Sequence, residues 1–303
     1  MQPATASPIF LLAPPRSCST VTVAMLAQHP QIYGFPELLL FTAPTVGALL
    51  GQRQEDVGLP DDWIERRLSG LYRAVAEVHR GSQDPAAIDW ARAWLAERAH
   101  WPTSRLMRHL VEAVRPRVAL EKSPETVTRD GALERCMTAF PDARYIHLTR
   151  HPAATVRSMK ENWRTLFTGL DAEAFHALCV RAWCLAHLRI LRALEKVPPR
   201  NRMRIKAEDV LRDPEGALSQ VVRRLGLDWN ETIAKSVRSP ERWRFGGLGP
   251  AGRLYGGDWK FLTSPALRTP QPEEGSAAED LGRGLEERPR AALAALMRRL
   301  GYT

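Results

Sequence analysis

The stretch Ile9-Phe10-Leu11-Leu12-Ala13-Pro14-Pro15-Arg16-Ser17-Cys18-Ser19-Thr20 decides the fold of this 303-residue chain. It begins with an apolar run of strand length that ends at two prolines, a pattern that predicts a buried β-strand. From Ser19 to Gln28 the apolar residues follow helical spacing. The chain therefore opens as strand, tight loop and helix, and the start of such a helix favours an anion because its first N–H groups are unpaired.

The loop itself carries groups that suit an anion. Arg16 supplies a forked cation, and Ser17, Ser19 and Thr20 supply hydroxyl donors. The order of residues is not that of a Walker A loop, which requires GxxxxGK[ST]. On this segment alone, a serine-capped helix following a strand is the alternative interpretation.

Further apolar runs of strand length lie at Val118 to Leu120, Tyr145 to Leu148 and Met203 to Ile205, with long helical patterns such as Ala172 to Glu195 between them. This alternation predicts an α/β fold with a central parallel sheet and helices on both faces, a P-loop-like three-layer arrangement. We expect a single domain over residues 1–303. It would contain a helical insertion at about 38–117, a loop covering the active site at about 239–284, and a C-terminal helix at 285–303.

A second polar constellation follows the run Arg144-Tyr145-Ile146-His147-Leu148-Thr149-Arg150-His151-Pro152. Arg150 stands where the predicted strand ends, and Ser158 lies about two turns into the next helix. Ligands of open α/β sheets bind at the carboxyl edge of the strands. An arginine that caps sheet carbonyls is the alternative role for Arg150.

The bulk properties restrict partners and location. The formal net charge is +9, almost all of it from arginine, which suits a polyanionic ligand or reflects base composition. Neither a basic stripe with interleaved aromatics nor a histidine cluster appears, so we expect neither nucleic acid nor a metal. The apolar stretch at 38–50 is too short to span a bilayer. Without a signal-peptide pattern or a CxxC pair, Cys18, Cys136, Cys179 and Cys184 are expected to be free thiols in the cytoplasm.

Together the two constellations resemble the sulfotransferase family. The first is similar to its PRSGTT-type loop and the second to its Arg-x7-Ser motif. Gly257-Asp258-Trp259-Lys260 resembles the C-terminal GxxGDWK loop, with Arg253 on one of its basic positions. Glu121-Lys122-Ser123-Pro124 resembles the segment of the subgroup that includes polyketide-associated and tyrosylprotein sulfotransferases. The matches run from Ile9 to Phe261.

The resemblance implies 3′-phosphoadenosine 5′-phosphosulfate (PAPS) as donor and no metal. The 5′-phosphosulfate would lie on Arg16, Ser17, Cys18, Ser19 and Thr20, and the 3′-phosphate on Arg150 and Ser158. Arg253, Gly257 and Lys260 would complete donor binding. Two departures stand out. Cys18 replaces a loop glycine and is strained if its φ is positive, and Ala207 replaces a tyrosine that contacts adenine.

The same resemblance suggests the catalytic residues. Tyrosylprotein members use a glutamate 21 residues beyond the loop arginine, and counting from Arg16 reaches Glu37. The histidine that cytosolic members place after the lysine is replaced here by Ser123 and Pro124. We therefore expect Glu37 as general base, with Lys122 and Arg16 offsetting charge on the leaving oxygen. An N-terminal helix carboxylate is the alternative role for Glu37.

Two other functions remain open at this point. A P-loop-like small-molecule kinase would use the same sheet edge, and a magnesium requirement would identify it. A non-catalytic nucleotide-binding module would keep the donor loops without Glu37 and Lys122. The acceptor is expected to be a hydroxyl on a small molecule, a lipid or a chain bound to a carrier protein; the pattern indicates neither which one nor the oligomeric state. Trp163, Trp183 and Trp229 are expected in the core rather than under an adenine.

Overall fold

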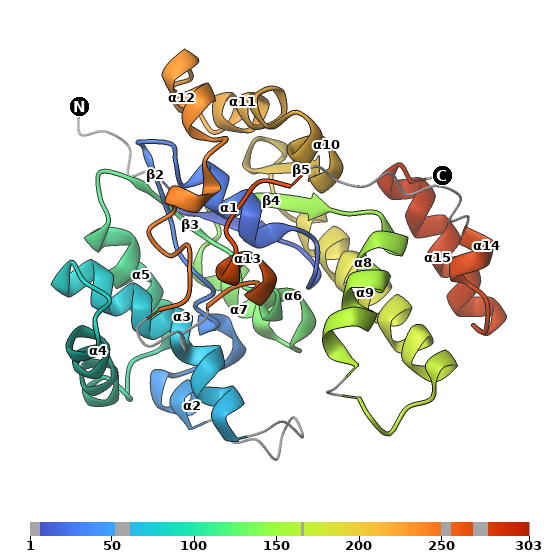
Figure 1. The fold of residues 1–303 in the computed structure, drawn as a ribbon, viewed down its shortest axis with the longest axis horizontal. Coiled ribbons are helices and arrows are strands. Elements are labelled where there is room, and N and C mark those ends of the chain that lie inside the picture. The colour runs from blue at the N-terminus through green and yellow to red at the C-terminus, as the bar shows by residue number, and fades with distance from the viewer. Residues whose placement is uncertain (1–6, 52–60, 165–166, 250–255, 269–277, 303) are drawn as a thin grey trace.

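A central parallel sheet organises the protein. The computed structural model describes residues 7–51, 61–164, 167–249, 256–268 and 278–302. In that part of the chain the strands form one sheet in the order β2-β3-β1-β4-β5 (Figure 1). Their bounds are β1 Ile9–Leu12, β2 Ile32–Gly34, β3 Val118–Glu121, β4 Arg144–Thr149 and β5 Arg202–Lys206. Every pairing between neighbours is parallel, which confirms the predicted fold class.

The side chains of the strands alternate between two covered faces. On one face, the ring of Phe10 meets that of Phe41 edge-on at a centroid distance of 5.6 Å, and His147 Nε2 lies 2.8 Å from His187 Nδ1 on α9 (Ala172–Glu195). On the other face, α1 (Ser19–Leu26) contacts β2, and α10 (Ala207–Arg212) contacts β5. Figure 1 shows α10 and α11 on one side of the sheet and α7 and α9 on the other.

Strand β2 is absent from the sequence-based expectation. Its three residues are too few to show a strand period, and they end at Gly34. The neighbouring strand defines it, because Ile32 pairs with Val118 and Gly34 with Leu120. A β-carbon on Gly34 would lie 2.7 Å from that of Ala27, so a glycine is needed where β2 passes α1.

Helices fill the chain between β2 and β3. They are α2 (Val46–Leu50), α3 (Asp61–Arg80), α4 (Pro85–Glu97) and α5 (Thr103–Ala113). Helix α4 begins as its sequence suggests, because the Asp84 carboxylate accepts a hydrogen bond from Ala87 N and Pro85 occupies the first turn. Beyond β3 the helices are α6 (Glu125–Thr128), α7 (Ala132–Ala139), α8 (Pro152–Trp163), α11 (Pro214–Arg224), α12 (Glu231–Ser236), α13 (Trp259–Thr263), α14 (Ala278–Leu281) and α15 (Glu287–Leu300).

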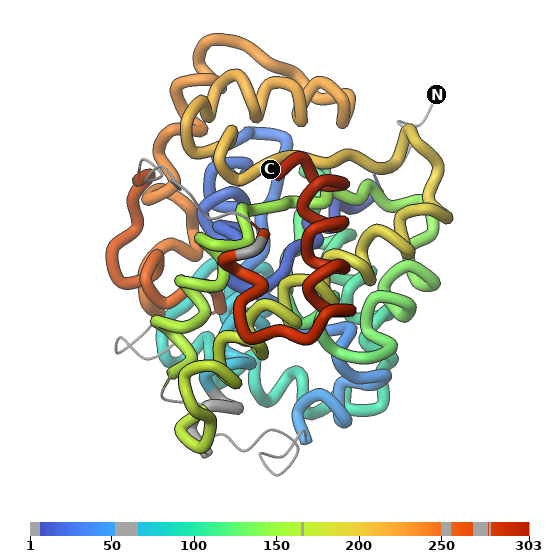
Figure 2. Tube along the Cα trace, turned by 90° about the vertical axis from the view of Figure 1, so that its right-hand side faces the viewer, coloured from blue at the N-terminus to red at the C-terminus, as the bar shows by residue number. Residues whose placement is uncertain are grey.

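Helix α9 is long and apolar enough, by length and composition, to cross a membrane. The sequence interpretation had considered only residues 38–50 for this role. In the fold, α9 packs against α6, α8 and α15, and Trp183 on its inner face is fully buried. Figure 2 shows the C-terminal helix α15 alongside it. This packing is that of a core helix.

The late segment at 239–284 is more structured than a covering loop. Besides α13 and α14 it contains a 3-10 turn at Pro240–Arg242. Its first part is fastened to the sheet, because the Trp243 indole donates to the Gly34 carbonyl at 2.9 Å. The C-terminal helix ends at Leu300 rather than at residue 303, since Gly301 takes a φ of 77° and terminates it.

Gly70, in the middle of α3, allows three backbone segments to meet. A β-carbon at Gly70 would lie 2.1 Å from the Glu37 carbonyl oxygen and 2.9 Å from Gly256 Cα. The Glu37 N–H donates to the Gly256 carbonyl at 2.9 Å. The backbone of Glu37 is therefore held between helix α3 and the segment that leads into Asp258.

Replacing Gly70 with alanine should destabilise the protein by roughly 1–3 kcal/mol, the usual cost of overpacking. Helix propensity alone would make the alanine variant more stable by about 1 kcal/mol. A lower free energy of unfolding would therefore report the backbone clash. Urea denaturation measures it. Gly169→Ala is the matched control, because a β-carbon there would meet no described atom within 4 Å. Equal stability of Gly70→Ala and the wild type would contradict the close approach.

Candidate active site

The loop between β1 and α1 has an unusual backbone. Arg16 and Cys18 both lie in the left-handed region, with φ of 65° and 59°. The positive φ that would strain Cys18 is therefore present. Cys18 occupies the N-cap position of α1, and its side chain makes no capping hydrogen bond. The serine-capped interpretation of this segment is thus wrong, because the N-cap residue is a cysteine that does not cap the helix.

Ser17 lies fully buried in this loop. Its hydroxyl has no hydrogen-bond partner among the described residues. A buried polar group without a partner costs free energy, and such groups usually mark a site that a ligand or water completes. The loop residues therefore fit an anionic ligand, which would accept a hydrogen bond from this hydroxyl.

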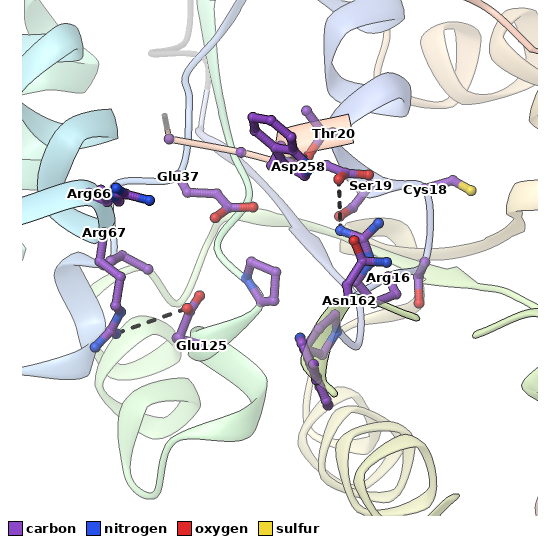
Figure 3. A pocket seen from close by; sticks show the side chains of 18 residues that line it. Arg16, Cys18, Ser19, Thr20, Glu37, Arg66, Arg67, Glu125, Asn162 and Asp258 are labelled. Atoms are coloured by element: carbon purple, nitrogen blue, oxygen red, sulfur yellow. Dashed lines mark hydrogen bonds and ion pairs between the residues drawn. The ribbon is translucent and has the colours of Figure 1, made fainter. Parts of the chain in front are cut away.

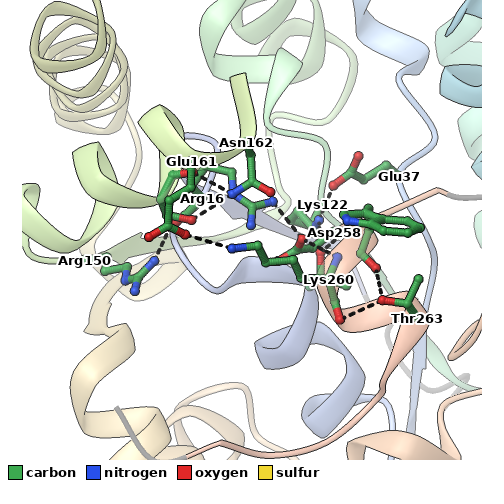
Figure 4. Close-up of polar contacts among 12 residues, drawn as sticks. Arg16, Glu37, Lys122, Arg150, Glu161, Asn162, Asp258, Lys260 and Thr263 are labelled. Atoms are coloured by element: carbon green, nitrogen blue, oxygen red, sulfur yellow. Dashed lines mark hydrogen bonds and ion pairs between the residues drawn. The ribbon is translucent and has the colours of Figure 1, made fainter. Parts of the chain in front are cut away.

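The Arg16 side chain joins the separate motifs (Figure 4). Its Nε donates to Ser158 Oγ at 3.1 Å, and its Nη1 forms an ion pair with Asp258 Oδ1 at 2.7 Å. Arg150 donates from Nη1 to the Arg16 carbonyl at 2.7 Å. The loop, the end of β4, helix α8 and the C-terminal segment thus meet around one residue.

Lys122 lies buried directly beyond the end of β3. Its ammonium group donates to Glu37 Oε1 at 2.5 Å and to Thr20 Oγ1 at 2.9 Å. The Lys122 side chain is 3% exposed and that of Glu37 is 20% exposed, so the pair is shielded yet open at the carboxylate. One ammonium group therefore connects the start of α1 with the segment after β2.

Behind this pair lies a second, fully buried carboxyl group. Glu121 Oε1 accepts hydrogen bonds from Ser123 Oγ at 2.5 Å and from Leu38 N at 3.4 Å. Burial raises the pKa of Glu121 to about 7, although both hydrogen bonds oppose the rise. Through the hydrogen bond from Leu38 N, Glu121 joins the segment that contains Glu37 to the end of β3.

Arg16, Thr20 and Glu37 border a cavity of 490 Å³ (Figure 3). One wall is the loop from Pro15 to Thr20 together with Asp258. The opposite wall is formed by residues from α3, α6 and the segment after β2. They are Glu37, Leu39, Arg66, Arg67, Pro124 and Glu125. Trp163 and Trp259 also border the cavity, and no histidine among the described residues does.

The C-terminal motif reaches the same place. Asp258 N donates to Thr20 Oγ1 at 3.0 Å, and a β-carbon on Gly257 would lie 3.1 Å from the Thr20 methyl carbon. Lys260 Nζ bonds Glu161 on α8 at 2.8 Å. Arg253 lies outside the described residues. Ala207 begins α10 and is buried, so it offers only a methyl group where the family's tyrosine is expected.

The sequence interpretation missed several residues of the site. Asp258 belonged to a quoted motif, but its contact with Arg16 joins residues 242 positions apart. Arg66, Arg67 and Glu125 lie on helical surfaces whose pattern gave no signal. Trp163, expected in the core, packs against the core cluster around α9 and also borders the cavity, whereas Trp183 is buried as expected. Within the described residues, no three His, Cys, Asp or Glu side chains gather as metal ligands would.

A parallel sheet whose first loop presents a helix start, an arginine and hydroxyls defines a P-loop-like α/β protein. Comparison with known proteins then gives the family. The sequence model of the sulfotransferase family matches residues 8–231, most of the chain. The chain belongs to the sulfotransferase family, whose members are enzymes.

Individual relatives agree with this assignment. The chain is 25% identical over 173 residues to the omega-hydroxy-beta-dihydromenaquinone-9 sulfotransferase Stf3 of Mycobacterium bovis and to that of Mycobacterium tuberculosis. That region covers 54% of this chain and 43% of each relative, so the chain matches less than half of their length.

Two solved structures share the fold over the whole chain. The sulfotransferase domain from the curacin biosynthetic pathway has a TM-score of 0.76 at 23% identity, and the match covers 98% of both chains. The sulfotransferase domain of the Synechococcus PCC 7002 olefin synthase has a TM-score of 0.72 at 24% identity. That second match covers 100% of this chain and 98% of the other.

The raised pKa of Glu121 predicts a pH-dependent stability. The folded protein holds this proton up to about pH 7, whereas the unfolded chain releases it near pH 4.3. Stability from the protonated form is therefore complete below pH 4.3 and is lost as the pH rises to about 7. Glutamine has no proton to lose. We expect Glu121→Gln to gain stability relative to the wild type between pH 5 and pH 8, measured by urea denaturation. A difference that stays constant across this range would contradict the assignment.

Proposed function

We propose that this sulfotransferase moves a sulfuryl group from PAPS to an acceptor hydroxyl. The observation that carries the proposal is the Lys122 ammonium group in contact with both Glu37 and Thr20. This contact puts a cation between residues 15–20, which we call the donor loop, and the partly exposed carboxylate of Glu37. Sulfuryl transfer needs a cation near the leaving oxygen and a base near the attacking one.

The donor would lie along the β1–α1 loop. The helix start and the hydroxyls of Ser17, Ser19 and Thr20 would bind the 5′-phosphosulfate, with Arg16 beside them and Cys18 contributing its backbone. Arg150 and Ser158 would bind the 3′-phosphate from the far side of Arg16. Gly257 and Lys260 would complete the donor site, and Arg253, outside the described residues, stays a predicted contributor to it. Asp258 would hold the Arg16 guanidinium in place through the ion pair it already makes.

The chemistry then follows from positions and charges. The acceptor hydroxyl attacks sulfur in line, and Glu37 takes its proton as the new S–O bond forms. The bond between sulfur and the 5′-phosphate oxygen breaks, and its electron pair stays on that oxygen. Lys122 and Arg16 offset the negative charge there. The products are a sulfated acceptor and 3′-phosphoadenosine 5′-phosphate (PAP).

The names of the relatives bear on the acceptor class. The mycobacterial relatives are named for a hydroxylated menaquinone, and the two solved domains come from the curacin biosynthetic pathway and an olefin synthase. The first name supports a hydroxyl on a small molecule or lipid, and a chain bound to a carrier protein stays a prediction. A cytoplasmic location also stays a prediction. The four cysteines are free thiols, three of them buried.

The donor site can be tested by removing Arg150. Arg150→Ala should weaken PAP binding by roughly 1.5–3 kcal/mol, or about 10- to 150-fold, because hydrogen bonds to a charged group are lost. Binding of AMP, which lacks the 3′-phosphate, should hardly change. Calorimetry with both ligands measures this. Arg135→Ala is the control, since Arg135 also donates to a backbone carbonyl, that of Phe41, at 2.8 Å. Equal losses for PAP and AMP would argue against a 3′-phosphate site.

The role of Glu37 can be tested by Glu37→Gln, which keeps the size and hydrogen bonding of the side chain and removes the base. We expect kcat for sulfation to fall roughly 10²–10⁴-fold, with the Kd of PAP unchanged. Because Glu37 is the ion partner of the buried Lys122, stability should also fall.

A second variant separates this loss of stability from catalysis. Glu77→Gln removes another shielded carboxylate, 15% exposed and paired with Arg244 at 2.8 Å, outside the cavity. It should lower stability and leave kcat unchanged. Retention of more than about a third of the wild-type rate by Glu37→Gln would end its assignment as the base.

A further inference from the structure

Arg67 and Glu125 face each other on the wall of the cavity opposite the donor loop. Arg67 lies on α3, and Glu125 is the first residue of α6, three positions beyond Lys122. Figure 3 shows the guanidinium of Arg67 directed toward the Glu125 carboxyl group, with Glu37 above them. None of the motifs that carry the family resemblance accounts for this pair.

Both side chains have an unsatisfied polar atom. Arg67 Nη2 and Glu125 Oε2 are shielded from solvent and have no hydrogen-bond partner among the described residues. The closest approach of the two groups, Nη2 to Oε1, is 4.0 Å, which is too long for a hydrogen bond. Three of the seven described residues with such an atom border this one cavity, and Ser17 is the third. Ser17 indicates a ligand group at the wall formed by residues 15–20. In the same way, Arg67 and Glu125 indicate a second ligand group at the opposite wall.

The charges indicate what kind of group that is. Within the described part of the chain, Arg67 Nη2 is an unpartnered N–H donor on a cation, so it suits an oxyanion of the ligand. Burial raises the pKa of the Glu125 carboxyl group and the negative charge of Glu37 raises it further, whereas the charge of Arg67 lowers it. Where Glu125 holds its proton, its O–H is a second donor beside Arg67.

The pair lies in the same cavity as Glu37, the residue proposed to take the proton of the acceptor hydroxyl. The charge of Glu37 acts on Glu125, so the two carboxyl groups are neighbours in one cavity. An acceptor whose hydroxyl lies at Glu37 would therefore share the cavity with Arg67 and Glu125. The remaining wall is apolar, since Leu39, Pro124 and Trp163 border it.

We propose that Arg67 and Glu125 form a subsite for a carboxylate that the acceptor carries in addition to its reacting hydroxyl. This inference rests on the proposed function, because it assumes that the hydroxyl lies at Glu37. The acceptor class it defines is a hydroxy acid with an apolar body. Arg67 would form a charge-assisted pair with the carboxylate, and Glu125 would donate a further hydrogen bond.

The test uses the full chain saturated with PAP and two probes, 3-hydroxydodecanoate and its methyl ester. The two differ in the carboxylate charge, so the ratio of their Kd values reports on the subsite. We expect the acid to bind at least about 10-fold more tightly to the wild type, the scale of one hydrogen bond to a charged group. Arg67→Met, which keeps the apolar stem, should abolish this preference and leave the ester's Kd within about twofold. Arg135→Met, with its arginine outside the cavity, should keep the preference.

Glu125→Gln supplies a second variant, because an amide keeps a donor without a titrating proton. It should retain most of the preference for the acid. Equal binding of acid and ester by the wild type, binding of neither, or a parallel loss of both in Arg67→Met would overturn the subsite. The same titration reports PAP binding. Failure of PAP to bind would overturn the proposed function and this inference together, whereas PAP binding without a preference for the acid overturns the subsite alone.

Discussion

The buried ammonium group of Lys122 is the constraint on which the site depends. A charged group 3% exposed must have partners, and it has Thr20 from the start of α1 and Glu37 from the segment after β2. Lys122 itself follows β3 directly. In a parallel sheet the carboxyl ends of neighbouring strands share one edge, so a single cation at that edge holds three consecutive βα connections together.

Two further contacts complete the enclosure of the cavity. The Arg16–Asp258 ion pair brings the C-terminal segment over the donor loop. The backbone junction at Gly70 holds the Glu37 segment between α3 and Gly256. Both are contacts between distant parts of the chain, and both act on residues that also touch Lys122 or its partners. The donor wall and the opposite wall are therefore positioned by one connected set of contacts.

The order of elements could be predicted because it depends on local pattern. The apolar runs at β1, β3, β4 and β5 and the helix over Ala172–Glu195 are readable without tertiary information. Strand β2 could not be predicted in this way, since three residues show no period. The segment from Ile32 is a strand only because it pairs with β3 at Val118. Trp163 was placed in the core for a similar reason. The hydrophobicity of Trp163 can be read from the sequence. Which side of α8 faces the cavity depends on how the helix packs in the fold.

By itself, the sequence determined the fold class, the loop between β1 and α1 and the motifs around Arg16, Lys122 and Arg150, because short segments with fixed spacing carry their own local geometry. Only the tertiary structure decided which of these side chains touch. It paired Lys122 with Glu37 across 85 residues and Arg16 with Asp258 across 242, and it left Arg67 and Glu125 without hydrogen-bond partners in the described part of the chain. Contacts over such separations depend on how helices and loops pack on the sheet, and burial of a polar atom is a property of that packing.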